Sequence, residues 1–402
     1  MAIFSGASGA SGASGASGAS GASGASGASG ASGAGGAIGG FLFSGPGYNP
    51  PYIDALITNR DGIVGKSQLT TMKDMPPELP LEDDQKDRDL VGLSRLGPGE
   101  RASIFDFELL SRISFQGDGK GKMSILSNGH PLATFHRPTP EIFGDQLELV
   151  ESYAELRSDR AAEIVSQIGV PHAFFGSIAF LHPERTRWTM ELIHAALRFA
   201  YAVEMRVKLA LNCRRPHEYS PQMQPIIACP LHGSLPSGHA TEAFLFAHLL
   251  AVLSTGKESL HGRAGQSVWV NQLMRQANRI AVNRTVAGVH FPVDSVAGCL
   301  LGLTLAEYLV KLCEGKQDGE EQGFRSCEFR GMLYPMRKKD PNKVDFIWQN
   351  FYDVDQNKLN VKKDAIIERY ASVLGASHPL PKPSKQLEWL WKKAKDEWSE
   401  SR

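Results

Sequence analysis

Three short segments of the sequence carry side chains that could bind an anion. The first, KLALNCRRP, places Lys208 seven residues before Arg215. On a helix, this spacing of nearly two turns would put both cations on one face, about 10 Å apart. Pro216 disfavours helical geometry at the residue before it, so the helix is expected to end near Arg215. By itself, this pattern is more typical of a solvated helix face.

The second segment, PSGHA, precedes an apolar helical run. Ser237 is a favoured N-terminal capping residue, and Gly238 lets the backbone approach a ligand closely. The free N–H groups at a helix start attract anions. His239 would lie in the first turn, beside whatever the turn binds. A serine nucleophile of the hydrolase type is not indicated, because the G-x-S-x-G pattern is absent.

The third segment, NRTVAGVHFPVD, contains Arg284, His290 and Asp294. Pro292 suits the first turn of a new helix. From that turn, Asp294 could reach back to one ring nitrogen of His290. Such a contact fixes the imidazole tautomer and leaves the other nitrogen available as a nucleophile or a ligand.

Together, the three segments supply a helix N-terminus, two histidines and three cations, a set that suits one tetrahedral oxyanion. The cations would neutralise its oxygens: Lys208, Arg215 and Arg284. The Ser237 hydroxyl and the Gly238 N–H would donate hydrogen bonds to them. His290 would approach the central atom in line, and His239, on the opposite side, would handle protons. A zinc site is disfavoured, because three converging cations would repel Zn²⁺.

The patterns K-x6-R-P, P-S-G-H and R-x5-H-x3-D, in this order, resemble the three-part signature of the type 2 phosphatidic acid phosphatase superfamily. The resemblance covers Lys208 to Asp294 directly. One departure is Asn283, where the third motif usually begins with serine. The superfamily includes bacterial acid phosphatases, lipid phosphatases and vanadium-dependent haloperoxidases. The resemblance therefore implies an enzyme that either forms a phosphohistidine at His290 or holds vanadate, with His290 as the axial ligand of vanadium.

For a haloperoxidase, the resemblance implies that hydrogen peroxide, activated on vanadate with the help of Lys208, oxidises a halide to a hypohalous species. That species then halogenates a small organic substrate. His232, in CPLHGSLPSGH, resembles the extra active-site histidine of vanadium bromoperoxidases, although a loop histidine that points to water is the alternative. The residues implied as catalytic are His239, His290, Lys208, His232 and Asp294. The residues implied as binding vanadate are Lys208, Arg215, Ser237, Gly238, His239, Arg284 and His290.

The composition of the chain limits its possible partners. Of 402 residues, 42% are hydrophobic, and 43 Lys plus Arg balance 43 Asp plus Glu. A balanced chain has no global reason to bind nucleic acid or an anionic membrane. His248 and Glu307 interrupt the two longest apolar runs, so no segment reaches the roughly 18 to 20 uninterrupted apolar residues of a membrane span. Since no signal peptide is seen either, we expect a soluble protein that is cytoplasmic by default.

The pattern along the chain predicts four parts. Residues 5–34 are ten copies of Ser-Gly-Ala, which cannot fill a core, so residues 1–40 are predicted to form a low-complexity tail. Residues 41–145 are predicted to form an extended arm that packs on a bundle. Helical spacing of apolar residues predicts a catalytic helical bundle over 146–315, followed by a charged C-terminal helical extension over 316–402. Because alternating strand patterns are scarce, the expected fold class is all-α, a bundle of the haloperoxidase and acid phosphatase type.

Three functions are compatible with the sequence. The long segments on both sides of the bundle favour a haloperoxidase, because small acid phosphatases are little more than the bundle and lipid phosphatases span membranes. We therefore predict a vanadate-dependent haloperoxidase that prefers bromide. The alternatives are a soluble phosphomonoesterase that acts through His290, and a non-catalytic oxyanion-binding or scaffold protein in which the Ser-Gly-Ala tail is the functional segment. The sequence leaves open the organic substrate and whether the chain forms a homo-oligomer.

Overall fold

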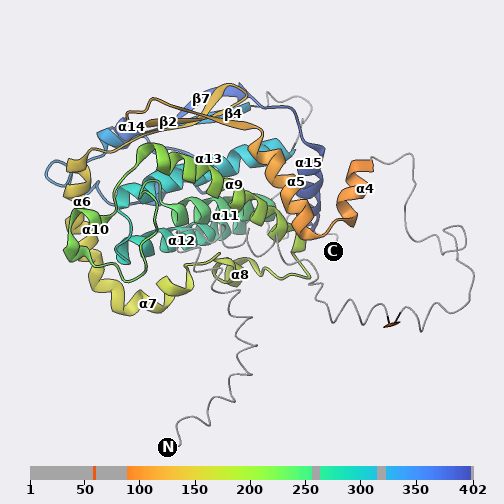
Figure 1. Cartoon of the computed structure of the whole chain (residues 1–402), viewed down its shortest axis with the longest axis horizontal. Coiled ribbons are helices and arrows are strands. Elements are labelled where there is room, and N and C mark those ends of the chain that lie inside the picture. Colours follow the sequence, from red (N-terminus) through yellow and green to blue (C-terminus); the bar gives the residue numbers. More distant parts are fainter. Residues whose placement is uncertain (1–57, 60–87, 256–262, 315–322, 400–402) are drawn as a thin grey trace, which may run out of the picture.

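The computed structural model of the chain describes residues 58–59, 88–255, 263–314 and 323–399. The predicted Ser-Gly-Ala tail over 1–40 and much of the predicted arm lie outside these residues. The described residues are mostly helical, and a mixed sheet covers one side of a helical bundle (Figure 1).

Four long helices form the centre of the bundle: α9 (Arg187–Leu211), α11 (Gly238–Ser254), α12 (Arg263–Val286) and α13 (Pro292–Glu314). The helix α11 packs against the other three. It is apolar on all sides, and all of its residues except Val252 are buried. A helix that is apolar all round belongs in the middle of a core, so α11 is the axis around which the bundle is built.

Shorter helices surround these four: α4 (Arg88–Arg95), α5 (Pro98–Leu110), α6 (Pro140–Tyr153), α7 (Arg157–Ser166), α8 (His172–Ala179), α10 (Pro216–Tyr219), α14 (Ile367–Tyr370) and α15 (Lys385–Asp396). The helices α7 and α8 pack on α12, on the side away from the sheet (Figure 1). The helices α5 and α15 pack on α9. This placement puts α7 beside the end of α12 that carries the third motif.

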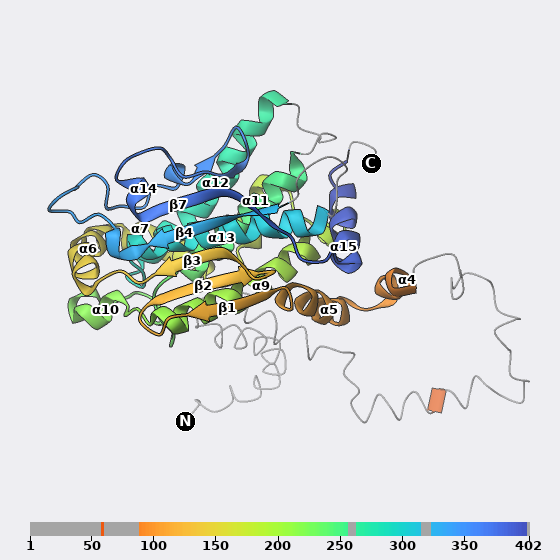
Figure 2. The same ribbon diagram turned by 90° about the horizontal axis from the view of Figure 1, so that it is seen from above.

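The sheet has the strand order β1-β2-β3-β4-β7, seen from above in Figure 2. Its strands are β1 (Ile113–Gly117), β2 (Lys122–Ser127), β3 (His130–His136), β4 (Gly323–Arg330) and β7 (Ala371–Pro379); a separate hairpin pairs β5 (Tyr352–Asp353) with β6 (Lys358–Leu359). The parallel pairing of β3 with β4 joins Ala133 to Cys327. The all-α prediction is therefore wrong outside the bundle. The predicted arm and the predicted helical extension instead share one sheet, which packs on α13 and α9.

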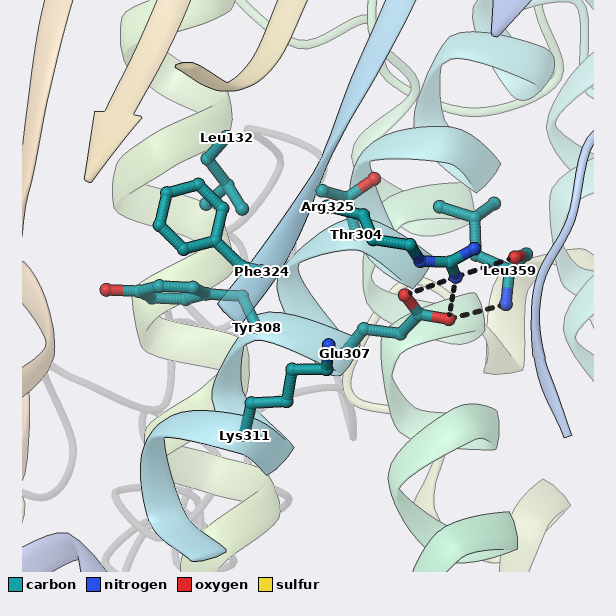
Figure 3. A pocket seen from close by; sticks show the side chains of 8 residues that line it. All are labelled: Leu132, Thr304, Glu307, Tyr308, Lys311, Phe324, Arg325 and Leu359. Atoms are coloured by element: carbon teal, nitrogen blue, oxygen red, sulfur yellow. Dashed lines mark hydrogen bonds and ion pairs between the residues drawn. The ribbon is translucent and has the colours of Figure 1, made fainter. Parts of the chain in front are cut away.

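A partly buried ion pair ties this sheet to the bundle. Glu307, the charge that interrupts the apolar run of α13, accepts hydrogen bonds from Nη2 of Arg325 on β4, at 2.8 and 2.7 Å. The backbone N–H of Leu359 on β6 donates to the same carboxylate at 2.6 Å, as Figure 3 shows. The charge within the apolar helix thus joins three elements.

By length and composition alone, α13 could cross a membrane, and 89% of its most apolar window is buried inside the structure. The criterion of an uninterrupted apolar run excluded this helix because Glu307 lies within it. The helix therefore passes a test of length and composition without containing an uninterrupted apolar run, and it is mostly buried in the structure.

Candidate active site

Lys208 lies near the C-terminal end of α9 and is almost completely buried. The helix ends before Asn212, which adopts a left-handed conformation with φ of 43°. The expectation that Lys208 and Arg215 share one helix face is therefore wrong. Instead, Nζ of Lys208 donates to three carbonyl oxygens of the loop before α11: those of Gly233 at 3.3 Å, Ser234 at 3.4 Å and Pro236. Burial lowers the pKa of Lys208 to about 8, and the Glu204 carboxylate one turn earlier opposes this shift.

Arg215 is buried and joins the two loops that carry the other motifs. Its Nη1 donates to the carbonyl oxygen of Val289 at 2.8 Å and lies 3.4 Å from Nε2 of His290. Its Nε donates to the carbonyl oxygen of His232 at 3.2 Å, and Nη2 lies 3.4 Å from Nδ1 of the same residue. His232 is half-buried. The structure therefore places the His232 ring against the same guanidinium as His290, and not wholly in water.

The P-S-G-H segment starts α11 as its sequence predicts. Ser237 is the N-cap, and its hydroxyl accepts from the backbone N–H of Ala240 at 3.5 Å. The backbone N–H of Ser237 donates to the carbonyl oxygen of Asp294 at 2.9 Å. A Cβ atom at Gly238 would lie 2.8 Å from the Glu204 carboxylate. Any larger residue at this position would therefore displace Glu204 or the helix start.

The helix α13 approaches this turn closely. A Cβ atom at Gly298 would lie 2.5 Å from the carbonyl oxygen of Ser237, closer than real contacts allow. The absence of a side chain at Gly298 therefore lets the helix that carries Asp294 support the helix start that carries His239.

His290 and Asp294 contact each other as their spacing predicts. Nδ1 of His290 lies 3.1 Å from Oδ2 of Asp294. That oxygen also accepts from the hydroxyl of Ser234 and from the backbone N–H of Phe291, the latter at 2.9 Å. Burial raises the pKa of Asp294 to about 6. Burial, reinforced by Arg215, holds the pKa of His290 well below its usual range. The neutral ring therefore donates from Nδ1 and keeps a lone pair on Nε2.

Arg284 brings buried N–H groups without partners to the site, beside the buried ring of His239. Nη2 of Arg284 donates to the carbonyl oxygen of Ile164 at 3.0 Å and lies 3.3 Å from Oε1 of Gln167. Within the described part of the chain, Nε and Nη1 of Arg284 have no hydrogen-bond partner, and the ring of His239 has none apart from the Gln167 backbone. Burial, together with the charge of Arg284, holds the pKa of His239 well below its usual range, although the nearby Gln167 backbone opposes this shift. Burial also lowers the pKa of Arg284 to about 10.

A buried guanidinium with unpaired N–H groups is costly unless a ligand compensates it. The unpaired N–H groups of Arg284 lie in a site with two further buried cations, Lys208 and Arg215, and this combination suits an oxyanion better than a metal cation. Residues 190–317 match the PAP2 superfamily. The match includes all three motifs, from Lys208 to Asp294. The superfamily contains phosphatases and haloperoxidases, so the match does not separate the two. No curated protein matches the chain.

A polar cluster from α7, outside the PAP2 match, was missed by the sequence reasoning. Gln167, directly after α7, is fully buried, and its Oε1 accepts from Nδ2 of Asn283 at 2.9 Å. Its Nε2 donates to Glu163 at 3.0 Å. Glu163 in turn pairs with Arg279 on α12 at 2.8 Å. The amide of Gln167 thus lies between the Glu163 carboxylate and Arg284.

Ser234 was also missed, although it lies inside the PAP2 match. Its hydroxyl contacts Asp294 and lies 3.4 Å from Nδ1 of His290. No local pattern distinguishes Ser234 from other loop serines, because its partners lie 56 and 60 residues further along the chain.

Proposed function

We propose that the PAP2 segment binds a tetrahedral oxyanion, and that the chain is a vanadate-dependent haloperoxidase that oxidises bromide with hydrogen peroxide. The observation that carries the proposal is that Nε and Nη1 of the buried Arg284 have no partner within the described residues. Their surroundings are cationic, since Lys208 and Arg215 are also buried.

The unpaired N–H groups of Arg284 favour an anionic ligand. Lys208, Arg215 and Arg284 are each at most 1% exposed. Three buried carboxylates act on Lys208, namely Glu204, Asp294 and Glu242, and Asp294 is already engaged by His290. Buried cations are stabilised by hydrogen-bonded anions. A bound oxyanion would supply acceptors for the two Arg284 nitrogens that have no partner within the described residues.

His290 is the side chain suited to bond the central atom. Asp294 holds its Nδ1, which leaves Nε2 with a lone pair at neutral pH. Such an imidazole can serve as a metal ligand or as a nucleophile. His239 is also held neutral, and so can accept a proton from a bound group.

The residues that would hold vanadate are those with donors or a ligand nitrogen: Lys208, Arg215, Ser237, Gly238, His239, Arg284 and His290. Bound vanadate would activate hydrogen peroxide for the two-electron oxidation of a halide. The protein's own part is to neutralise the anion through its cations and to keep His290 neutral and oriented. The partners in this proposal are hydrogen peroxide, bromide and a small organic acceptor.

One observation favours the haloperoxidase over the phosphatase: His232 contacts Arg215 at the site, where bromoperoxidases are expected to carry an extra histidine. The second candidate is a phosphomonoesterase. In that reaction, Nε2 of His290 attacks phosphorus, the ester oxygen leaves, and water then hydrolyses the N–P bond. The same neutral, oriented His290 supports this candidate.

Two assays on the full chain distinguish the candidates. The protein is incubated with orthovanadate, and bromide oxidation by hydrogen peroxide is measured beside hydrolysis of p-nitrophenyl phosphate without vanadate. We expect bromide oxidation that depends on vanadate. Hydrolysis alone would support the phosphatase. Anion binding with neither activity would support the non-catalytic alternative.

His290→Ala is the decisive variant, with the exposed His182→Ala as its matched control. We expect His290→Ala to lose both activities and His182→Ala to keep whichever activity is present. Retention of either activity in His290→Ala would exclude this site as the catalytic one.

A further inference from the structure

A cavity of about 160 Å³ lies along the N-terminal half of α9, between that helix and α5. Its walls come from both helices and from the segment before α9: Pro98, Ala102, Pro183, Arg187, Met190, Glu191, His194 and Arg198. Lys208 is ten residues beyond Arg198, about 15 Å further along the helix. In Figure 1, α5 lies against one end of α9, away from the loops that carry the three motifs. The cavity is therefore separate from the candidate active site.

Most charges in the walls are already neutralised. Nε of Arg198 donates to both carboxylate oxygens of Asp106, at 2.8 and 2.9 Å. Arg101 binds Glu191 through two nitrogens, at 2.5 and 2.9 Å. Burial lowers the pKa of His194 to about 4, so its ring is neutral at physiological pH. These two ion pairs and the neutral His194 ring together contribute no net charge to the cavity.

Arg187 is the exception among the lining residues. Its side chain is exposed, and its guanidinium lies over the ring of Trp188, 4.4 Å from the centroid. Among the ion pairs of the described residues, none involves Arg187. The cavity therefore carries one uncompensated positive charge.

The rest of the lining suits the aromatic ring of a ligand. Pro98, Ala102 and Pro183 are apolar, the Met190 thioether makes favourable contacts with aromatic rings, and the His194 ring can stack. A cavity of about 150 Å³ with apolar walls can accommodate benzene. The volume at α9 is therefore that of a single aromatic ring with a small substituent.

We propose that this cavity is a binding site for a small aromatic monocarboxylate. The ring lies against Met190 and Ala102, and the carboxylate pairs with Arg187. This inference does not depend on the proposed function of the PAP2 site, because no residue is shared between the two sites.

The test is calorimetric titration of the full chain with benzoate, with benzyl alcohol as the neutral probe and acetate as the anion without a ring. We expect benzoate to bind with a dissociation constant of about 1 mM or tighter. Arg187→Gln should weaken benzoate binding about two- to fivefold, the range of an exposed ion pair, and leave benzyl alcohol binding unchanged. Arg185→Gln, a neighbouring arginine that does not line the cavity, is the matched control and should behave as the unmodified chain.

Ala102→Leu should abolish binding of both ring-containing probes, because the added carbons fill the cavity. Thermal unfolding followed by circular dichroism checks that each variant is folded. If the unmodified chain does not bind benzoate, or if folded Arg187→Gln and Ala102→Leu both bind it normally, the proposal is wrong. Tight binding of acetate would also overturn it, since the ring would then contribute nothing.

Discussion

Replacement of Gln167 by glutamate tests whether α7 sets the anion affinity of the PAP2 site. The amide of Gln167 separates the Glu163 carboxylate from Arg284, with its Oε1 3.3 Å from Nη2 of Arg284. Because this contact is neutral, most of the charge of Arg284 is available to a bound anion. A carboxylate at position 167 would compete with that anion for the same guanidinium.

The size of the effect follows from the geometry. Two unit charges 3.3 Å apart attract by about 5 kcal/mol at an effective dielectric constant of about 20. The anion still has two other cations, so it loses part of this energy and not the whole. A hydrogen bond to a charged group contributes roughly 1.5 to 3 kcal/mol. We therefore expect the affinity for orthophosphate to fall about ten- to hundredfold.

Gln167→Glu alone also places two carboxylates 3.0 Å apart, because Nε2 of Gln167 now donates to Glu163. That repulsion could destabilise the fold for a reason unrelated to the anion. The double variant Glu163→Gln, Gln167→Glu avoids it. This exchange keeps one amide, one carboxylate and their mutual hydrogen bond, and it moves the negative charge next to Arg284. It also removes the ion pair of Glu163 with Arg279, so Glu163→Gln alone is measured beside it.

The assay is isothermal titration with orthophosphate at fixed ionic strength, together with the bromide and p-nitrophenyl phosphate assays. The exchange variant should bind phosphate weakly, while Gln167→Met, which changes no charge, should stay within a few-fold of the unmodified chain. If the exchange variant is folded and binds phosphate with unchanged affinity, Arg284 does not contact the anion, and the role given to Gln167 is refuted.

Three further predictions follow from the structure. Because burial lowers the pKa of Lys208 to about 8, its ammonium loses its charge as pH rises through that value. The affinity for sulfate, an anion that does not titrate in this range, should therefore fall about tenfold or more there. Lys208→Met should bind sulfate weakly at all pH values, without an inflection. His232→Phe should change steady-state bromide oxidation by about ten- to hundredfold and shift its pH optimum, with less change in phosphate ester hydrolysis; unchanged bromide kinetics would remove the bromoperoxidase assignment. Gly298→Ala should destabilise the protein by about 1 to 3 kcal/mol in urea unfolding, because its Cβ would meet the Ser237 carbonyl. Gly144→Ala, at an exposed position of α6 with no atom near its Cβ, should be neutral or stabilising; equal effects of the two substitutions would contradict the close helix contact.

The sequence by itself determined the features that depend on neighbours a few residues away. Ser237 caps α11 and Pro292 begins α13, because a cap or a first-turn proline acts on the backbone within one helical turn. The contact between His290 and Asp294 spans four residues and follows from the same local geometry. The PAP2 motifs were readable for this reason, and so was the helical centre of the fold, whose long apolar runs are bounded by Gly and Pro.

The tertiary structure alone decided which distant segments meet. The parallel pairing of β3 with β4 joins residues about 190 positions apart, and the sequence of neither strand indicates with which strand it pairs. Gln167 reaches Arg284 from α7, and the two residues are 117 positions apart along the chain. Arg215 was expected on the helix of Lys208, but the left-handed turn at Asn212 directs the chain into a loop, where Arg215 meets His232 and His290. Burial completed the site: the same lysine, histidine and aspartate types have shifted pKa values only because the packed helices exclude water from them.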